Sequence, residues 1–162
     1  MYNLDVVRIR LVKETSWYSD KPITCSQDAV DLLAEKLGDL DREMFCILNL
    51  TTDGKVINFN LVSMGTLNAS LVSPREVFKS SILSNAAGII AIHNHPSGTV
   101  SPSKQDKLIT QRLREAGELL DIQLLDHVII GGDNGRYYSF HEENLLNTDF
   151  KRQFINERYD CR

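Results

Sequence analysis

Apolar residues along the chain follow two different spacings, and these alternate up to about residue 140. Short apolar runs, rich in valine, isoleucine and aromatic residues, predict β-strands. These runs cover residues 6–12, 44–50, 55–63, 66–72, 88–94, 124–130 and 136–140. The sequence Thr-Thr-Asp-Gly at 51–54 separates the second run from the third, and its Asp-Gly pair predicts that a hairpin joins them.

Apolar residues three or four positions apart predict three helices between these strands. Thr24 and Gln27 match the spacing of a capping box, and Gly38 stands where the first helix should end. The second helix should begin at residues 73–76, Ser-Pro-Arg-Glu, which combine a cap, a proline and a glutamate, and run to about Asn85. The predicted apolar faces are Val30, Leu33, Ala34 and Leu37 in the first helix, and Leu108, Leu113, Ala116 and Leu120 in the third, which begins near Ser103.

Strands and helices therefore interleave, with hairpins in the middle of the chain. This order predicts one mixed α/β (α+β) domain, with helices packed against a partly antiparallel sheet. A chain of 162 residues buries roughly two thirds of its unfolded surface in a single core. We expect an N-terminal strand and loop over residues 1–25, the domain over 26–141, and a C-terminal extension over 142–162 that is either a short helix or mobile.

Charge composition narrows the function classes. The formal net charge is −4, the wrong sign for a domain that binds nucleic acid by neutralising phosphates. Arg8, Arg10 and Lys13 form a small basic strip, which is better explained as the solvated face of the first predicted strand. Nucleic acid is therefore unsupported by charge as a partner.

The apolar segments and the cysteines bear on localisation. Charged residues interrupt the N-terminal apolar run, and no stretch approaches the ~18 apolar residues of a membrane span. The three cysteines form no Cys-x-x-Cys pair, which favours free thiols in a reducing compartment. We expect a cytoplasmic protein without a membrane segment; the sequence leaves its oligomeric state open.

The sequence AIHNHPSGTVSPSKQD, residues 91–106, predicts a metal site. His93 and His95 lie two apart at a strand end, so both side chains leave the same face of the sheet. Pro96 ends the strand, and the chain then reverses into the helix that carries Asp106 in its first turn. Two histidines and a carboxylate are the protein ligands of a catalytic zinc site, whose metal-bound water has a pKa of ~7.

Each part of this motif also has a purely structural explanation. Ser103 and Asp106 alone make an ordinary helix N-terminus, and a single His-x-His pair is a weak signal. The letters His-Asn-His also occur in a class of nucleases, where they are spread over a ββα element, so this match is treated as accidental. His127, in an apolar strand, is better explained as a buried residue that hydrogen-bonds its surroundings, and His141 as exposed.

Hydrolysis at such a site also requires a general base. Two glutamates compete for this role. Glu76 has a structural role as the third residue of its predicted capping box, whereas Glu43 precedes a strand that could lie beside residues 88–94. We therefore favour Glu43, with Glu76 as the alternative.

The sequence HNHPSGTVSPSKQD closely resembles the RadC family, a bacterial branch of the JAMM (JAB/MPN) metalloproteases. The pattern of the wider family is an early glutamate, then His-x-His-Pro, then Ser-x-x-Asp. Glu43, residues 93–96 and residues 103–106 match these parts in order. The RadC branch adds the Ser-Gly after the histidines, the stretch Pro74 to Phe78 and the Leu-Asp-His at 125–127. The similarity runs over roughly residues 29–140.

The resemblance implies a JAMM fold, with helices around a curved mixed sheet. It also implies one Zn²⁺ held by His93, His95 and Asp106, with Glu43 as general base through the metal-bound water and Ser103 helping to hold the oxyanion. The implied reaction is hydrolysis of a peptide or isopeptide bond in a peptide or protein substrate of unknown identity.

Two other functions stay open at this point. One is a non-catalytic scaffold that keeps the fold and the metal. The other is a DNA-repair-associated or anti-restriction accessory factor, or a metal-dependent nuclease, with nucleic acid as a partner through family association. Longer RadC proteins carry a helix-hairpin-helix region of a DNA-binding type before this domain, and the segment before residue 26 is too short to contain one. This departure puts a DNA-repair role in doubt.

Overall fold

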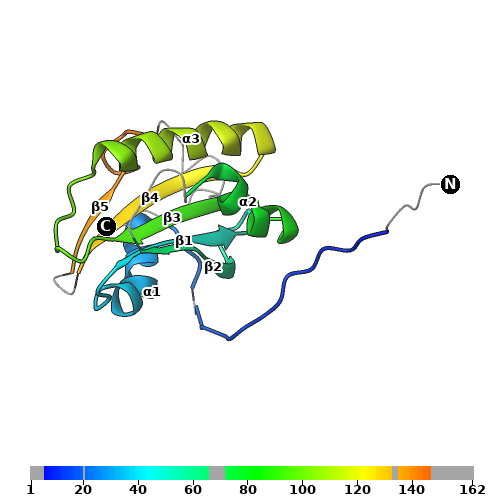
Figure 1. Ribbon diagram of the computed structural model, residues 1–162, viewed down its shortest axis with the longest axis horizontal. Helices are drawn as coiled ribbons and strands as arrows, with labels where there is room; N and C mark the ends of the chain where they lie inside the picture. Colours follow the sequence, from blue (N-terminus) through cyan, green and yellow to red (C-terminus); the bar gives the residue numbers. More distant parts are fainter. Residues whose placement is uncertain (1–5, 20, 66–71, 133–134, 147–162) are drawn as a thin grey trace.

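The computed structural model describes residues 6–19, 21–65, 72–132 and 135–146. Within these residues the chain forms three helices and five strands, which interleave as the apolar pattern predicts (Figure 1). In chain order they are α1 (Ser26–Leu37), β1 (Glu43–Leu50), β2 (Val56–Gly65), α2 (Pro74–Leu83), β3 (Gly88–Asn94), α3 (Lys104–Leu120), β4 (Gln123–Gly131) and β5 (Arg136–Ser139).

The five strands form one mixed sheet in the order β2-β1-β3-β4-β5. β1 and β2 make the predicted antiparallel hairpin, and β1 also pairs antiparallel with β3. β3 pairs in parallel with β4, so α3 is the crossover between them. β3 therefore lies in the middle of the sheet, and all seven of its residues are buried.

Two hydrophobic clusters lie on opposite faces of this sheet. α2 and α3 cover one face, where Phe45, Ala91 and Ile129 from three neighbouring strands pack with Leu113 of α3. α1 covers the other face, where Leu33 packs with a second set of strand residues. The two faces are visible in Figure 1, with α3 and α1 on opposite sides of the strands. The predicted α+β class, with helices around a partly antiparallel sheet, is confirmed.

The predicted strand over residues 6–12 is wrong within this chain. Residues 6–19 form an exposed arm without regular structure, which leaves the body of the molecule in Figure 1. A strand needs a neighbour for its backbone groups, and the described part of the chain provides none for this segment. The predicted strand over 66–72 falls almost entirely outside the described residues.

The first helix starts one residue later than its capping signal predicts. Cys25 rather than Thr24 is the N-cap of α1, and Asp28 rather than Gln27 is its third residue. The reason is that the Asp28 carboxylate accepts the backbone N–H groups of Thr24 and Cys25, at 2.8 and 3.3 Å. Gly38 ends the helix as predicted.

The cysteines differ in their surroundings. Cys46 is a free thiol, fully buried in the core, and burial raises its pKa. Cys25 is half-buried and disulfide-bonded, so the expectation of free thiols is wrong for this residue.

Candidate metal centre

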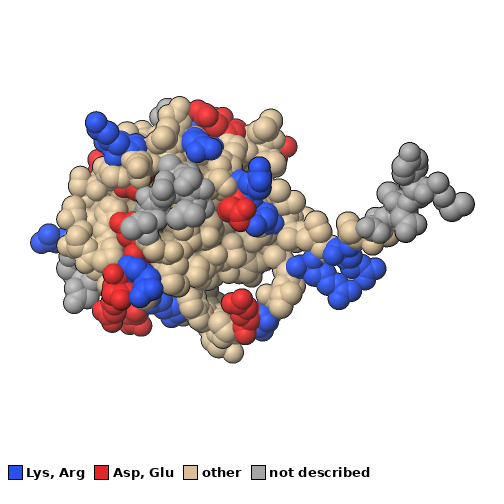
Figure 2. Space-filling model, viewed as in Figure 1, with Lys and Arg blue, Asp and Glu red and all other residues tan. Residues whose placement is uncertain are grey.

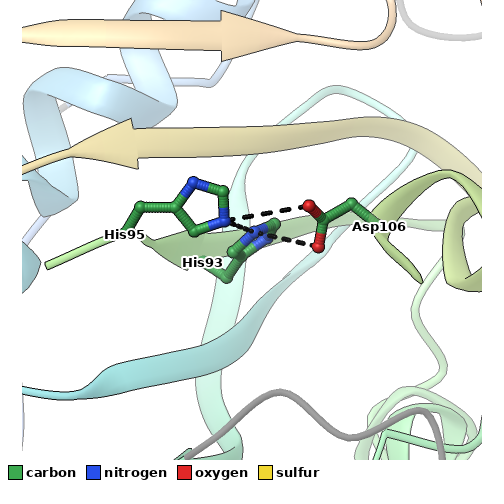
Figure 3. A group of neighbouring side chains, drawn as sticks. All are labelled: His93, His95 and Asp106. Carbon is green, nitrogen blue, oxygen red and sulfur yellow. Dashed lines mark hydrogen bonds and ion pairs between the residues drawn. The ribbon is translucent and has the colours of Figure 1, made fainter. Parts of the chain in front are cut away.

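Three side chains from the motif meet at one end of β3. His93 lies within β3, His95 follows the strand, and Asp106 belongs to the first turn of α3 (Figure 3). Gly98, with a φ of 77°, provides the left-handed conformation that the reversal between them requires. One potential ligand atom of each of the three residues lies within 4.8 Å of the others, so the group could hold a metal ion.

The local structure of α3 fixes the Asp106 carboxylate. Its Oδ2 accepts the Ser103 backbone N–H at 2.6 Å, and the Ser103 hydroxyl oxygen accepts the Asp106 N–H at 3.1 Å. The predicted helix N-terminus is therefore a capping box, which orients the carboxylate toward the histidines. Asp106 Oδ1 lies 3.3 Å from Nε2 of His93, and Oδ2 lies 3.7 Å from Nε2 of His95.

A chain of hydrogen bonds from Thr110 determines which nitrogen of His93 carries its hydrogen. The single hydroxyl hydrogen of Thr110 is donated to the Asp106 carbonyl oxygen at 2.6 Å, because a carbonyl can only accept. Nδ1 of His127, 2.6 Å from the same hydroxyl oxygen, must then be the donor. Nε2 of His127 is left as an acceptor for Nδ1 of His93 at 2.8 Å. His93 therefore keeps an unprotonated Nε2, the atom that faces Asp106.

A backbone carbonyl determines the tautomer of His95 in the same way. Nδ1 of His95 lies 2.6 Å from the Thr99 carbonyl oxygen and must donate to it, which leaves Nε2 unprotonated. The unprotonated Nε2 atoms of His93 and His95 then face each other at 3.1 Å, beside a carboxylate. Two lone pairs and a negative charge directed at one point repel each other unless a cation lies near, so the arrangement suits a metal ion.

Burial keeps the inner histidines neutral. Desolvation lowers the pKa of His93 to about 4, against the opposing effect of Asp106. His127 is fully buried, and desolvation together with the nearby His93 and His95 lowers its pKa well below its usual value. Because only a neutral imidazole can ligate a metal, His93 is ready to do so throughout the neutral range.

The strand register brings Glu43 to the same end of the sheet. Phe45 is paired with His93 across β1 and β3, and their rings stack with centroids 6.0 Å apart. Glu43 is two residues before Phe45 and therefore on the same face of the sheet. If the antiparallel register is continued by two residues, Glu43 comes level with His95.

Asn94 holds this part of β1 in place. Its side chain points away from the histidines, and its Oδ1 accepts the Met44 N–H at 2.8 Å while its Nδ2 donates to the Arg42 carbonyl at 3.1 Å. These two bonds flank Glu43 on either side along the chain. The fully buried Asn94 side chain therefore replaces backbone pairing where β3 ends.

The structural role expected of Glu76 is not observed. The Ser73 side chain makes no capping bond, and the Glu76 carboxylate instead pairs with Lys79 one turn along α2. The capping argument against Glu76 is therefore wrong, and the strand register is the better reason to favour Glu43. His141, expected to be exposed, is half-buried, and its N–H donates to the buried carboxylate of Asp126 at 2.9 Å.

Comparison with known proteins identifies the family. The model of the RadC-like JAB domain matches residues 23–145. The chain belongs to this family. It is similar to UPF0758 proteins of Methanosarcina mazei, 43% identical over 126 residues, and of Desulforamulus reducens, 48% identical over 124 residues. The UPF0758 protein of Moorella thermoacetica is 49% identical over 120 residues.

These alignments cover most of this chain but only part of each relative. They span 78%, 76% and 74% of the chain, and 54%, 54% and 52% of the respective relatives. The chain therefore spans about half the length of the curated relatives that it matches. Within its described residues, none of the helices is at once long and apolar enough to cross a membrane.

Two residues that shape the site escape sequence reasoning. Thr110 lies one helical turn after Asp106, so its place on the same face of α3 could be predicted, but its contact with His127 depends on the pairing of β3 with β4. Asn94 stands between the two histidines, and nothing in the sequence shows that its amide reaches the backbone of β1.

Proposed function

We propose that the protein is a zinc-dependent hydrolase of peptide or isopeptide bonds. The observation that carries this proposal is the pair of unprotonated Nε2 atoms of His93 and His95 facing the Asp106 carboxylate. Two imidazoles and one carboxylate suit Zn²⁺ and leave a coordination position for a further ligand, as in catalytic zinc sites. Membership of the RadC-like JAB domain family supports the same assignment.

A zinc ion held by these residues would supply Lewis-acid polarisation of a substrate carbonyl and an activated water. Side chains of the protein carry out the proton transfer and stabilise the developing charge. Glu43 accepts a proton from the attacking water as its oxygen bonds to the carbonyl carbon, and returns that proton to the amine nitrogen as the C–N bond breaks. Its register position level with His95 supports this role.

The Ser103 hydroxyl stabilises the negative charge that develops on the carbonyl oxygen by donating a hydrogen bond to it. Its side-chain oxygen accepts the Asp106 N–H, and this bond leaves the hydroxyl hydrogen available for donation. Ser103 is exposed and His95 is only half-buried, whereas His93 is fully buried. A substrate would therefore approach from the side of His95 and Ser103, where peptide or protein chains have access.

The test is cleavage of peptide and isopeptide libraries by the zinc-loaded protein, with Glu43→Gln and Glu76→Gln as a matched pair. We expect Glu43→Gln to lower kcat by about 100-fold or more without loss of zinc, since it removes a general base but no ligand. The kcat of Glu76→Gln should equal that of the parent. Equal rates in Glu43→Gln and the parent would show that the base is assigned wrongly, and an inactive zinc-loaded parent would favour a non-catalytic scaffold.

A further inference from the structure

The exposed N-terminal arm, residues 6–17, has the sequence pattern of a strand but pairs with no strand among the described residues. Val7, Ile9 and Leu11 fall on one side of an extended chain, and Arg8 and Arg10 fall on the other. Ile9 is 73% exposed and Val7 81% exposed. Figure 2 shows the arm projecting from the body, with Lys and Arg side chains gathered near its outer part.

At β2 the sheet has an edge that could pair with such a strand. β2 is the outermost strand, paired only with β1 among the described residues. Its ten residues, VINFNLVSMG, include no charged residue and no proline, the usual devices that prevent an edge strand from pairing. The opposite edge, β5, has only four residues and begins with Arg136.

The two faces of β2 fit the two faces of the arm. On the α1 face, Phe59, Leu61 and Met64 stand opposite residues of the apolar cluster beneath α1, and Leu61 and Met64 remain exposed. On the other face, Asn58 and Asn60 are polar. An added strand with Val7, Ile9 and Leu11 on the α1 face would extend the apolar surface and place its arginines beside the asparagines.

In an extended form, most of residues 6–12 cannot pair with the β2 edge of their own chain. Trp17 packs on Phe59, with ring centroids 4.6 Å apart, and the Lys36 ammonium lies 5.1 Å from the Trp17 ring centroid. Val12 lies five residues before Trp17, which is about 17 Å of extended chain. Continued along β2 from Phe59 toward Gly65, Val12 would come level with about Met64, so residues 6–10 would run past the end of the strand. In the opposite direction, all of residues 6–12 would run past Val56.

A reversal that brought the arm back is disfavoured by its sequence. Residues 6–17 contain no glycine, proline, asparagine or aspartate, the residues that best support tight turns. The arm therefore leaves its own domain as a strand-forming segment anchored at Trp17. A second copy of the chain offers the same unpaired β2 edge, and two copies can exchange arms reciprocally in a closed dimer.

We propose that the chain forms a homodimer in which residues 6–12 of each copy add as a strand to the β2 edge of the other. This inference does not depend on the proposed hydrolase function, since it uses neither the candidate ligands nor Glu43. It explains why a segment with strand spacing is exposed, and why a long, uncharged edge strand has no second neighbour in the described part of the chain.

The test is sedimentation velocity of the full chain over about 1 to 100 µM, where assembly depends on concentration. Ile9→Lys places a charge in the arm and Leu61→Lys places one at the edge, while Leu119→Lys, 86% exposed on α3, is the matched control. We expect a dimer whose dissociation constant rises at least about tenfold in both variants but not in the control. All three positions are exposed, so the melting temperature of each variant should not fall below that of the parent.

A mixture of the two variants makes the test specific for exchange. The intact arm of Leu61→Lys can still pair with the intact edge of Ile9→Lys, so the mixture should dimerise more tightly than either variant alone. A parent that stays monomeric at the highest concentration, or a mixture no tighter than its components, would overturn the proposal. A monomer that shifts labelled DNA, and loses this binding in Arg10→Glu, would assign the arm to nucleic acid instead.

Discussion

Nδ1 of His93 donates to Nε2 of His127 across 2.8 Å, and this bond joins a candidate metal ligand to the interior of the sheet. In many metal sites the partner of a ligating histidine is a carboxylate or a backbone carbonyl. Here it is a fully buried neutral histidine, fixed in turn by the Thr110 hydroxyl. The directions of the hydrogen bonds from Thr110 through His127 to His93 all follow from one acceptor, the backbone carbonyl of Asp106.

This chain of bonds predicts that Thr110 affects metal binding without touching the metal. Thr110→Val keeps the shape of the side chain but removes the acceptor for His127 Nδ1, so both the tautomer and the orientation of His93 become less well defined. We expect the zinc affinity to fall by about 10- to 100-fold, as for other partners of metal-ligating histidines. Competition with a chromophoric chelator measures this directly.

Thr99→Ala is the matched control for Thr110→Val. His95 bonds the backbone carbonyl of Thr99, so loss of the Thr99 side chain should leave the zinc affinity unchanged. Equal affinities for Thr110→Val and the parent would show that His127 does not need this acceptor.

Asn94 is expected to contribute to stability rather than to metal binding. Asn94→Ala leaves the Met44 N–H and the Arg42 carbonyl without their partner at a buried position, which should lower the free energy of unfolding by about 1–3 kcal/mol. Urea denaturation measures this loss, with Gln111→Ala, on the exposed side of α3, as control. A stability equal to that of the parent would contradict the role of Asn94 in holding β1.

The lowered pKa of His93 makes the stability of the metal-free protein depend on pH. Between pH of about 4, the folded value, and about 6.5, the unfolded value, the unfolded chain binds a proton that the folded protein does not. The free energy of unfolding should therefore rise with pH across this window. On acidification through the window, the contribution of His93 to this free energy falls by at most roughly 3 kcal/mol. His127 acts in the same direction.

Urea denaturation of the metal-free parent and of His93→Gln at several pH values within this window separates the contribution of His93 from that of the carboxylates. The parent should lose more stability than the variant on acidification. Parallel pH profiles for the two proteins would mean that His93 is not held neutral by burial.

The candidate ligands could be predicted from sequence because they lie close together along the chain. Strand alternation puts His93 and His95 on one face, and a helix cap places Asp106 at the start of α3, so only one reversal separates them. The contact of Thr110 with His127 needs the parallel pairing of β3 with β4, and local spacing does not encode which strands become neighbours.

The same limit explains the error at residues 6–12. Alternating β-branched residues show that the segment can be a strand, but a strand forms only where another strand accepts its backbone bonds. The hairpin of β1 and β2 was predictable because the second strand follows the first after only five residues, 51–55, which include the Asp-Gly pair. The arm has no such neighbour along the chain.

Elemental analysis of the purified protein tests whether His93, His95 and Asp106 form a metal centre. His95→Ala and His141→Ala, prepared in the same way without a chelating column, form the matched pair. We predict one zinc per chain in the parent and in His141→Ala, and its loss in His95→Ala. A parent that holds no zinc after reconstitution and dialysis, or equal zinc in both variants, would mean that these three residues do not form a zinc site.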